Sequence, residues 1–71
     1  MTHNGIVRRF DGELGYGYIV PDDGTPDVFV HFTALDIAGI SSLGEGQRVA
    51  FQPVREGGIT RATNLRLAGN K

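Results

Sequence analysis

Turn-forming residues interrupt this chain so closely that no long helix fits between them. Glycine occurs 11 times and proline 3 times among the 71 residues, and the short apolar runs between them recur at roughly ten-residue intervals. This spacing indicates a small all-β fold and is not that of a helical bundle. The predicted strands cover residues 5–10, 15–20, 27–32, 47–55 and 61–67.

The connections between these strands carry local turn chemistry. Proline, aspartate and glycine crowd the segment 21–26, where each residue type favours a turn. Thr33 is expected to cap a single helical turn that runs through Asp36. Pro53 cannot donate a ladder hydrogen bond, so the later half of its strand is expected at an edge or a bulge.

The length of the chain limits the fold further. A chain of 71 residues allows one domain, expected over residues 1–71 with a frayed tail at 68–71. Closing the sheet into a barrel would remove the two exposed edges of an open sheet. The expected core comprises Val7, Phe10, Ile19, Val28, Val30, Leu35, Leu43, Val49, Phe51, Leu65 and Leu67.

Charge and composition argue against several classes of protein. The sequence has no cysteine and only 2 histidines, so neither a disulfide framework nor a metal site is expected. It shows no signal peptide and no membrane span, so a cytoplasmic location is expected. With a net charge of −1, any affinity for nucleic acid must come from the local placement of residues.

Two of the predicted strands place aromatic side chains on one solvent face. Side chains alternate across a strand, so the valines of "DVFVHF" face the core and its aromatic residues face outward. Gly15 and Gly17 are expected on the inner face, where the missing side chains permit close coiling. An exposed aromatic patch usually marks a binding surface, and rings in a row can stack unpaired bases. The predicted patch comprises Tyr16, Tyr18, Phe29 and His31, with Phe32 at its rim.

The two motifs resemble those of the cold-shock protein family. "LGYGYI" is similar to the first ribonucleoprotein motif of that family, and "DVFVHF" is similar to the second. The segments "GIVRRFDGELGYGYIVPDDGTPDVFVHFTAL", "SLGEGQRVAF" and "RATNL" extend the resemblance over about residues 4–67. The resemblance implies a single cold-shock domain, which is a five-stranded antiparallel barrel of the oligonucleotide/oligosaccharide-binding type.

The resemblance also implies a function. Members of this family bind single-stranded RNA and DNA with low sequence specificity, as RNA chaperones or regulators of transcription and translation. Arg8 matches a lysine near the nucleic-acid backbone, and Asp27 matches an aspartate that hydrogen-bonds a base edge. No cofactor, membrane or small-molecule substrate is implied, and a monomer is expected, with a homodimer as the alternative. The implied nucleic-acid-binding residues are Arg8, Arg9, Tyr16, Tyr18, Asp27, Phe29, His31, Phe32 and Arg61.

Several positions depart from the family pattern. Arg9 stands where the family usually has tryptophan, Leu14 where it has lysine, and Ile40 where many bacterial members have phenylalanine. Arg61 takes the place of a glutamine before the last strand. A guanidinium plane can stack on a base and also attract phosphate, so Arg9 is expected to compensate in part. The departures indicate a divergent member with weaker or differently tuned binding.

Two other functions fit the sequence less well. Catalysis lacks a nucleophile, and the only histidine–carboxylate candidates are His31 and Asp27. A small barrel with an aromatic face could instead bind a proline-rich peptide as a protein-interaction module. Arg8, Arg9 and Arg61 near the aromatic face favour phosphate, and retention on single-stranded DNA resin would discriminate between the two ligands.

Overall fold

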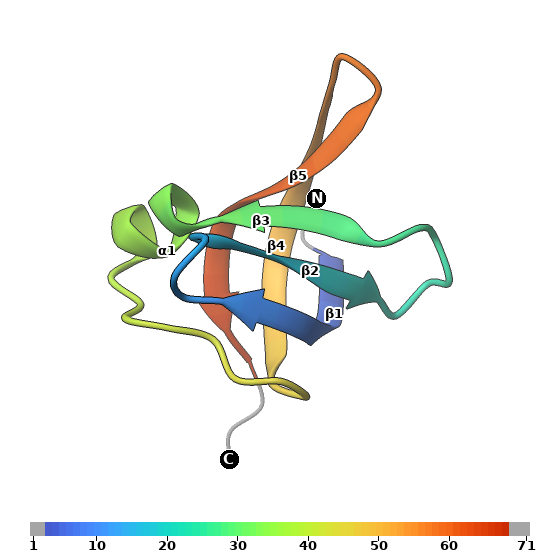
Figure 1. Ribbon diagram of the computed structural model, residues 1–71. Coiled ribbons are helices and arrows are strands. Elements are labelled where there is room, and N and C mark those ends of the chain that lie inside the picture. Colours follow the sequence, from blue (N-terminus) through green and yellow to red (C-terminus); the bar gives the residue numbers. More distant parts are fainter. Residues whose placement is uncertain (1–2, 69–71) are drawn as a thin grey trace.

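The computed structural model describes residues 3–68 and contains five strands and one helix (Figure 1). The strands are β1 (His3–Asp11), β2 (Tyr16–Pro21), β3 (Val28–His31), β4 (Arg48–Glu56) and β5 (Ile59–Leu67). The helix α1 (Phe32–Ala38) follows β3. All five strands predicted from the sequence are confirmed, and only their ends differ.

The five strands close into a barrel in the order β1-β2-β3-β5-β4. Four of the five pairings are antiparallel, whereas β3 and β5 run parallel and meet where Phe29 lies opposite Arg61. The expected all-β barrel is therefore confirmed, with a parallel closing pair in place of full antiparallel pairing. An odd number of strands cannot alternate in direction around a closed ring, so at least one neighbouring pair must be parallel.

Helix α1 is longer than the single turn that the sequence predicted, and its cap is a different residue. His31 has an extended backbone, and its Nδ1 accepts a hydrogen bond from the backbone N–H of Thr33 at 3.3 Å. The ring nitrogen thus satisfies a free amide of the first turn, so His31 and not Thr33 is the N-cap. The helix ends at Gly39, whose φ of 75° is the left-handed conformation that glycine adopts readily.

The core fills the inside of the barrel and follows the expected side-chain alternation in most strands. Phe10 only packs against it, and Leu67, the last residue of β5, is 54% exposed at the end of its strand. Ala62 is a core residue that the sequence did not reveal. The buried residues are Val7, Ile19, Val28, Val30, Leu35, Leu43, Val49, Phe51, Ala62 and Leu65.

A bulge in β5 explains why Ala62 was missed. The register between β4 and β5 shifts between Ala50 and Gln52, and Asn64 on the facing strand has a φ of 48°. The extra residue reverses the alternation, so Ala62 and Leu65 both point inward. The Asn64 side-chain amide donates to Oε1 of Gln52 at 2.7 Å and fixes the bulge.

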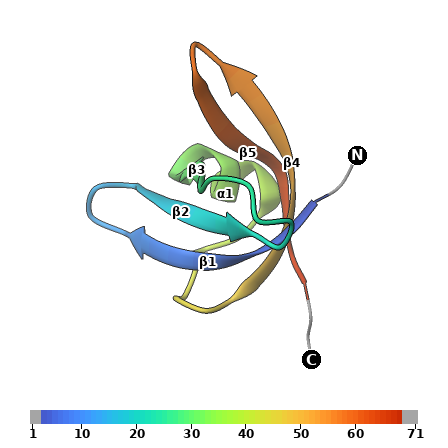
Figure 2. The ribbon, with the colours of Figure 1, turned by 90° about the vertical axis from the view of Figure 1, so that its right-hand side faces the viewer.

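The β4–β5 hairpin extends past the rest of the barrel (Figures 1 and 2). Among the described residues, β1 pairs with β4 from Ile6 to His3, which lies opposite Phe51, and the later half of β4 pairs with β5 alone. Pro53 lies in this half, paired with β5 at Ala62. Within residues 3–68 no strand pairs with Pro53 on its other side, which fits the expected edge position, because an edge residue needs no N–H for a second ladder.

The end of the chain is described only in part. The backbone N–H of Ala68 donates to the carbonyl oxygen of Arg48 at 3.0 Å, so this first residue of the expected tail still contacts the sheet. The remainder of that tail, residues 69–71, lies outside the described residues. Within residues 3–68, the structure contains no helix that is long and apolar enough to span a membrane.

Candidate nucleic-acid interface

The predicted aromatic patch is present on the outer side of β2 and β3. Tyr16 lies opposite His31 and Tyr18 opposite Phe29, and residues paired across antiparallel strands share a face. Ile19, which follows Tyr18 on β2, is fully buried, as alternation requires. The aromatic cluster, as we define it, comprises Tyr16, Tyr18, Phe29, His31 and Phe32.

The rings of the aromatic cluster form one continuous surface. The Phe29 ring centroid lies 5.6 Å from that of Tyr16 and 5.9 Å from that of Tyr18. The His31 ring lies 6.3 Å from Phe29 and 4.5 Å from Phe32. These separations are those of interacting aromatic pairs. Because Tyr18 is 40% and Phe32 52% exposed, the cluster offers flat apolar surface to a ligand at both ends.

Gly15 determines where the Phe32 ring lies. Its φ is 81°, and a side chain there would place Cβ 2.8 Å from the Phe32 ring. The Gly15 carbonyl oxygen also accepts the backbone N–H of Phe32 at 2.8 Å. Gly15 is therefore a turn residue before β2. The sequence-based prediction that it lies on the inner face of a strand is wrong. Positive φ is the reason that the turn needs glycine.

Gly17 lies on the inner face as expected, and strand β1 is the neighbour that requires glycine there. A Cβ at Gly17 would overlap the carbonyl oxygen of Arg9 and lie 2.7 Å from Cα of Phe10. Glycine at this position lets β1 and β2 approach closely between the two tyrosines.

A bulge in β1 places both arginines of that strand on the outer surface. Val7 pairs with Ile19 and is buried, but the register then shifts, and Arg9 pairs with Tyr18. Strict alternation after Val7 would have turned Arg9 inward, and the extra residue of the bulge prevents this. Both Arg8 and Arg9 are exposed, and Arg9 lies beside Tyr18 on the shared face.

Carboxylates accompany the other two predicted cations. Nη1 of Arg8 lies 3.7 Å from Oδ2 of Asp27. Nη2 of Arg61, which sits opposite Phe29 on β5, lies 2.7 Å from Oε1 of Glu56. Within residues 3–68, Arg9 is thus the one predicted cation without an ion pair. Exposed ion pairs of this kind contribute only about 0–1 kcal/mol to stability.

The positions that depart from the family pattern lie in different surroundings. Leu14 is 63% exposed in the turn between β1 and β2. Ile40 is partly buried and packs against the core, so its side chain does not extend the aromatic cluster. Of Arg9, Leu14 and Ile40, only Arg9 is paired with a residue of the aromatic cluster, which is Tyr18.

The residues considered for catalysis are held apart. His31 Nδ1 is engaged by Thr33, and Asp27 is paired with Arg8, so the two do not form a histidine–carboxylate pair. Among the described residues no group of three potential metal ligands comes together. Asp23 belongs to the turn after β2, where the Thr25 hydroxyl and then its backbone N–H lower the pKa of the Asp23 carboxyl.

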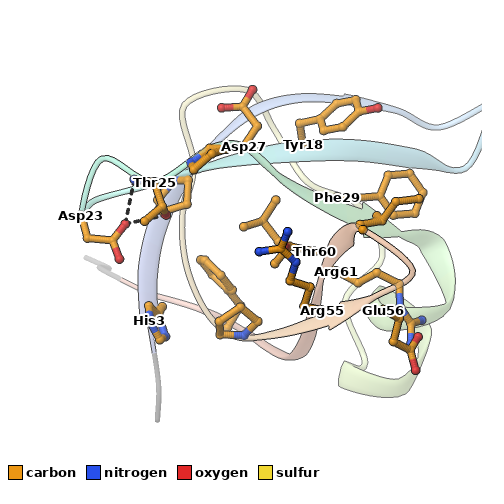
Figure 3. A pocket seen from close by; sticks show the side chains of 17 residues that line it. His3, Tyr18, Asp23, Thr25, Asp27, Phe29, Arg55, Glu56, Thr60 and Arg61 are labelled. Atoms are coloured by element: carbon orange, nitrogen blue, oxygen red, sulfur yellow. Dashed lines mark hydrogen bonds and ion pairs between the residues drawn. The ribbon is translucent and has the colours of Figure 1, made fainter.

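A groove that the sequence did not predict borders the aromatic cluster (Figure 3). Its volume is about 930 Å³, and Tyr18 and Phe29 form part of one wall. The β4–β5 hairpin forms the opposite wall, with Arg55 and Thr60 facing the groove. No local sequence signal marks these residues, because barrel closure alone brings β5 beside β3.

Known proteins resemble this chain over most of its length, including the strands that carry the aromatic cluster. The 'Cold-shock' DNA-binding domain matches residues 3–68. The cold shock protein CspA of Rhizobium meliloti is 47% identical over 68 residues, or 93% of this chain and 99% of that protein. A cold shock-like protein of Aquifex aeolicus is 41% identical over 69 residues, or 97% of this chain and 99% of that protein. The cold shock-like protein CspE of Escherichia coli is 50% identical over 48 residues, or 68% of this chain and 70% of that protein.

Proposed function

The chain belongs to the cold-shock domain family, whose members bind nucleic acid and are not catalytic, and we propose that it binds single-stranded DNA and RNA. The observation that carries this proposal is the continuous aromatic cluster across β2, β3 and the first residue of α1. Unpaired bases expose their faces, whereas the bases of a duplex are already stacked on one another. Each base has a π-face, so stacking on the rings gives low sequence specificity.

The proposed roles of the charged residues complement the stacking. Arg8 and Arg9 lie on the strand beside Tyr18 and attract the phosphates of a bound strand. Arg61 lies beside Phe29 from the other side and attracts them there. The Asp27 carboxylate can accept a hydrogen bond from a base edge once Arg8 has turned to a phosphate.

The proposed cellular role is that of an RNA chaperone or a regulator of transcription and translation in the cytoplasm. A surface that stacks bases without reading their edges can hold many RNA segments in the unpaired state. Binding of this kind shifts the equilibrium of a weak hairpin toward its open form. A hairpin labelled at its ends would report this opening when the protein is added.

Intrinsic tyrosine fluorescence tests the proposed binding directly. The chain has 2 tyrosines and no tryptophan, and both tyrosines belong to the aromatic cluster. Titration with a single-stranded pyrimidine oligonucleotide, DNA or RNA, is expected to quench their emission, and the matching duplex is expected to bind much more weakly. If neither the DNA nor the RNA oligonucleotide changes the tyrosine emission and a proline-rich peptide quenches it, the protein-interaction module is favoured.

The salt dependence of binding tests the electrostatic part of the proposal. Arg8, Arg9 and Arg61 can neutralise about two to four phosphates, which predicts a log–log slope of about −1.5 to −3 for a single strand. This slope is modest because the net charge of the chain is −1 and two of these arginines share their charge with carboxylates. A slope near zero would contradict the assignment of a phosphate-bearing ligand.

A further inference from the structure

His31 belongs both to the aromatic cluster and to the start of helix α1. Its ring centroid lies 4.5 Å from that of Phe32 and 6.3 Å from that of Phe29, so its orientation affects the middle and the rim of the cluster. Both polar groups of Thr33 that can donate contact Nδ1 of this ring, the backbone nitrogen at 3.3 Å and the hydroxyl oxygen at 3.1 Å. Two contacts from one residue to one ring nitrogen restrict rotation of the imidazole.

The backbone hydrogen bond decides which nitrogen of His31 carries the proton. A backbone N–H can only donate, so Nδ1 accepts from Thr33 and is unprotonated. The neutral imidazole then has its proton on Nε2, and the Thr33 hydroxyl donates to Nδ1 as well. Within residues 3–68, Nε2 has no hydrogen-bond partner and is not buried. His31 therefore offers an N–H donor at the free end of its ring, beside the stacking surface.

The turn after β2 contains the same arrangement with a different acceptor (Figure 3). There the backbone N–H of Thr25 donates to Oδ1 of Asp23 at 3.1 Å, and the Thr25 hydroxyl donates to the same atom at 2.7 Å. Thr25 and Thr33 are both exposed, and each directs two donors at the side chain two residues before it. The Thr25 pair lies outside the aromatic cluster and is therefore a matched reference for the Thr33 pair.

We propose that Thr33 is a positioning residue of the aromatic cluster, which fixes the plane of the His31 ring and makes Nε2–H of that ring a hydrogen-bond donor to the bound strand. The inference rests on the proposed function, because His31 acts on a strand only if the cluster binds one. Thr33 acts through His31 and needs no contact with the strand itself. A ring that is already held in one plane loses less conformational freedom when a ligand binds.

Protonation of His31 would remove this arrangement. A protonated imidazole carries hydrogens on both nitrogens, so Nδ1 no longer accepts from Thr33. Histidine ordinarily titrates near pH 6.5, between the two conditions of pH 5.5 and pH 8. Tyr16 lies opposite on β2, Arg61 is the neighbouring cation on β5, and Asp36 lies further along α1. Side chains of these three types do not change charge between pH 5.5 and 8. The effect of Thr33 should therefore depend on pH through His31.

The test begins with affinity for a single-stranded pyrimidine oligonucleotide at pH 8. Thr33→Val removes the hydroxyl and keeps the shape of the side chain, and Thr25→Val is the matched control. We expect Thr33→Val to weaken binding roughly two- to fivefold, the scale of one hydrogen bond, and Thr25→Val to weaken it by less than about twofold. Thr33→Ser keeps the hydroxyl and should restore most of the affinity.

Three further measurements separate positioning from a structural role. In the His31→Phe background, which keeps a ring but has no Nδ1, Thr33→Val should have no further effect on affinity. At pH 5.5 the affinities of Thr33→Val and the unmodified protein should differ less than at pH 8. Nitrogen NMR of the ring at pH 8 should show the proton on Nε2 in the unmodified protein and a larger share on Nδ1 in Thr33→Val.

Several outcomes would overturn the inference. An equal loss from Thr33→Val with His31 and with Phe at that position would show that Thr33 does not act through the ring. A loss that is the same at pH 5.5 and pH 8, or equal to that of Thr25→Val, would show the same. Circular dichroism on each variant confirms that the fold is intact. If the unmodified protein binds no oligonucleotide, the proposed function fails, whereas the nitrogen spectrum still reports whether Thr33 controls the ring.

Discussion

The two hairpins that border the groove are both antiparallel pairs, yet their outer surfaces differ. The end of the β4–β5 hairpin projects past the barrel (Figure 2). The β2–β3 hairpin carries rings on its outer side, whereas the projecting end carries the charged residues Arg55 and Glu56. The core fixes the backbone of the first hairpin, so its rings are held ready to stack. The projecting end of the second hairpin, residues 53–60, contributes no buried residue to the core. There Arg61 is paired with Glu56, whereas Arg55 has no ion pair among residues 3–68. The stacking rings and the charged residues of the groove thus lie on different hairpins, so each can be substituted without changing the other.

The largest expected effect comes from breaking the core under the aromatic hairpin. Ile19 on β2 is fully buried, so Ile19→Ala should lower the free energy of unfolding by about 2–5 kcal/mol. The same change at Ile59 on the projecting hairpin is the control, because Ile59 is 58% exposed and little of its surface contacts the core. Urea unfolding followed by circular dichroism measures both. Equal losses at the two positions would show that both hairpins depend on the core alike.

Removing a ring from the outer side of the same hairpin should affect binding and spare the fold. Tyr18→Ala should weaken affinity for a single strand by roughly 1–3 kcal/mol through lost base stacking, and Tyr16→Ala should act in the same direction. Leu14→Ala is the control, since Leu14 is also exposed, lies in the turn between β1 and β2, and carries no ring. The thermal midpoint of each variant should change little. Unfolding of Tyr18→Ala without a loss of affinity per folded molecule would mean that the ring serves the core.

Arg9→Trp exchanges charge for stacking at the edge of the aromatic hairpin. An indole beside Tyr18 should raise affinity for a pyrimidine oligonucleotide by roughly 1 kcal/mol at high salt, where charge is screened and stacking is not. At low salt the gain should shrink or vanish, because a phosphate-attracting charge has been lost. Paired titrations at the two salt concentrations measure the difference. Equal weakening at both would show that Arg9 makes a specific contact that an indole cannot replace.

The smallest expected effect concerns the ion pair of the projecting hairpin. Glu56→Gln removes the carboxylate that holds Arg61, so affinity for a single strand should rise by up to about 1 kcal/mol at low salt. Asp22→Asn is a close control, because it breaks the Arg48–Asp22 pair, also 2.7 Å long, and changes the net charge equally. That pair does not line the groove. Titrations that give equal gains for the two variants would mean that net charge alone, and not Arg61, sets the affinity.

The sequence determined the features that depend on neighbours along the chain. Turn residues separated the strands, and alternation in "DVFVHF" placed Val30 inward and Phe29 outward, because successive side chains on a strand must point to opposite faces. The same local rule placed Tyr16 and Tyr18 on a common side. The aromatic cluster could therefore be predicted before the fold was seen, and so could most of the core.

Tertiary structure alone decided the features that depend on register between distant strands. Bulges reverse the alternation at Arg9 and at Asn64, and a bulge is set by which residues on the partner strand are paired. Barrel closure brings Arg61 beside Phe29 although the two are far apart in the chain, and it gives Arg55 a groove to face. These placements follow from pairing across the barrel, which no local pattern in a single sequence encodes.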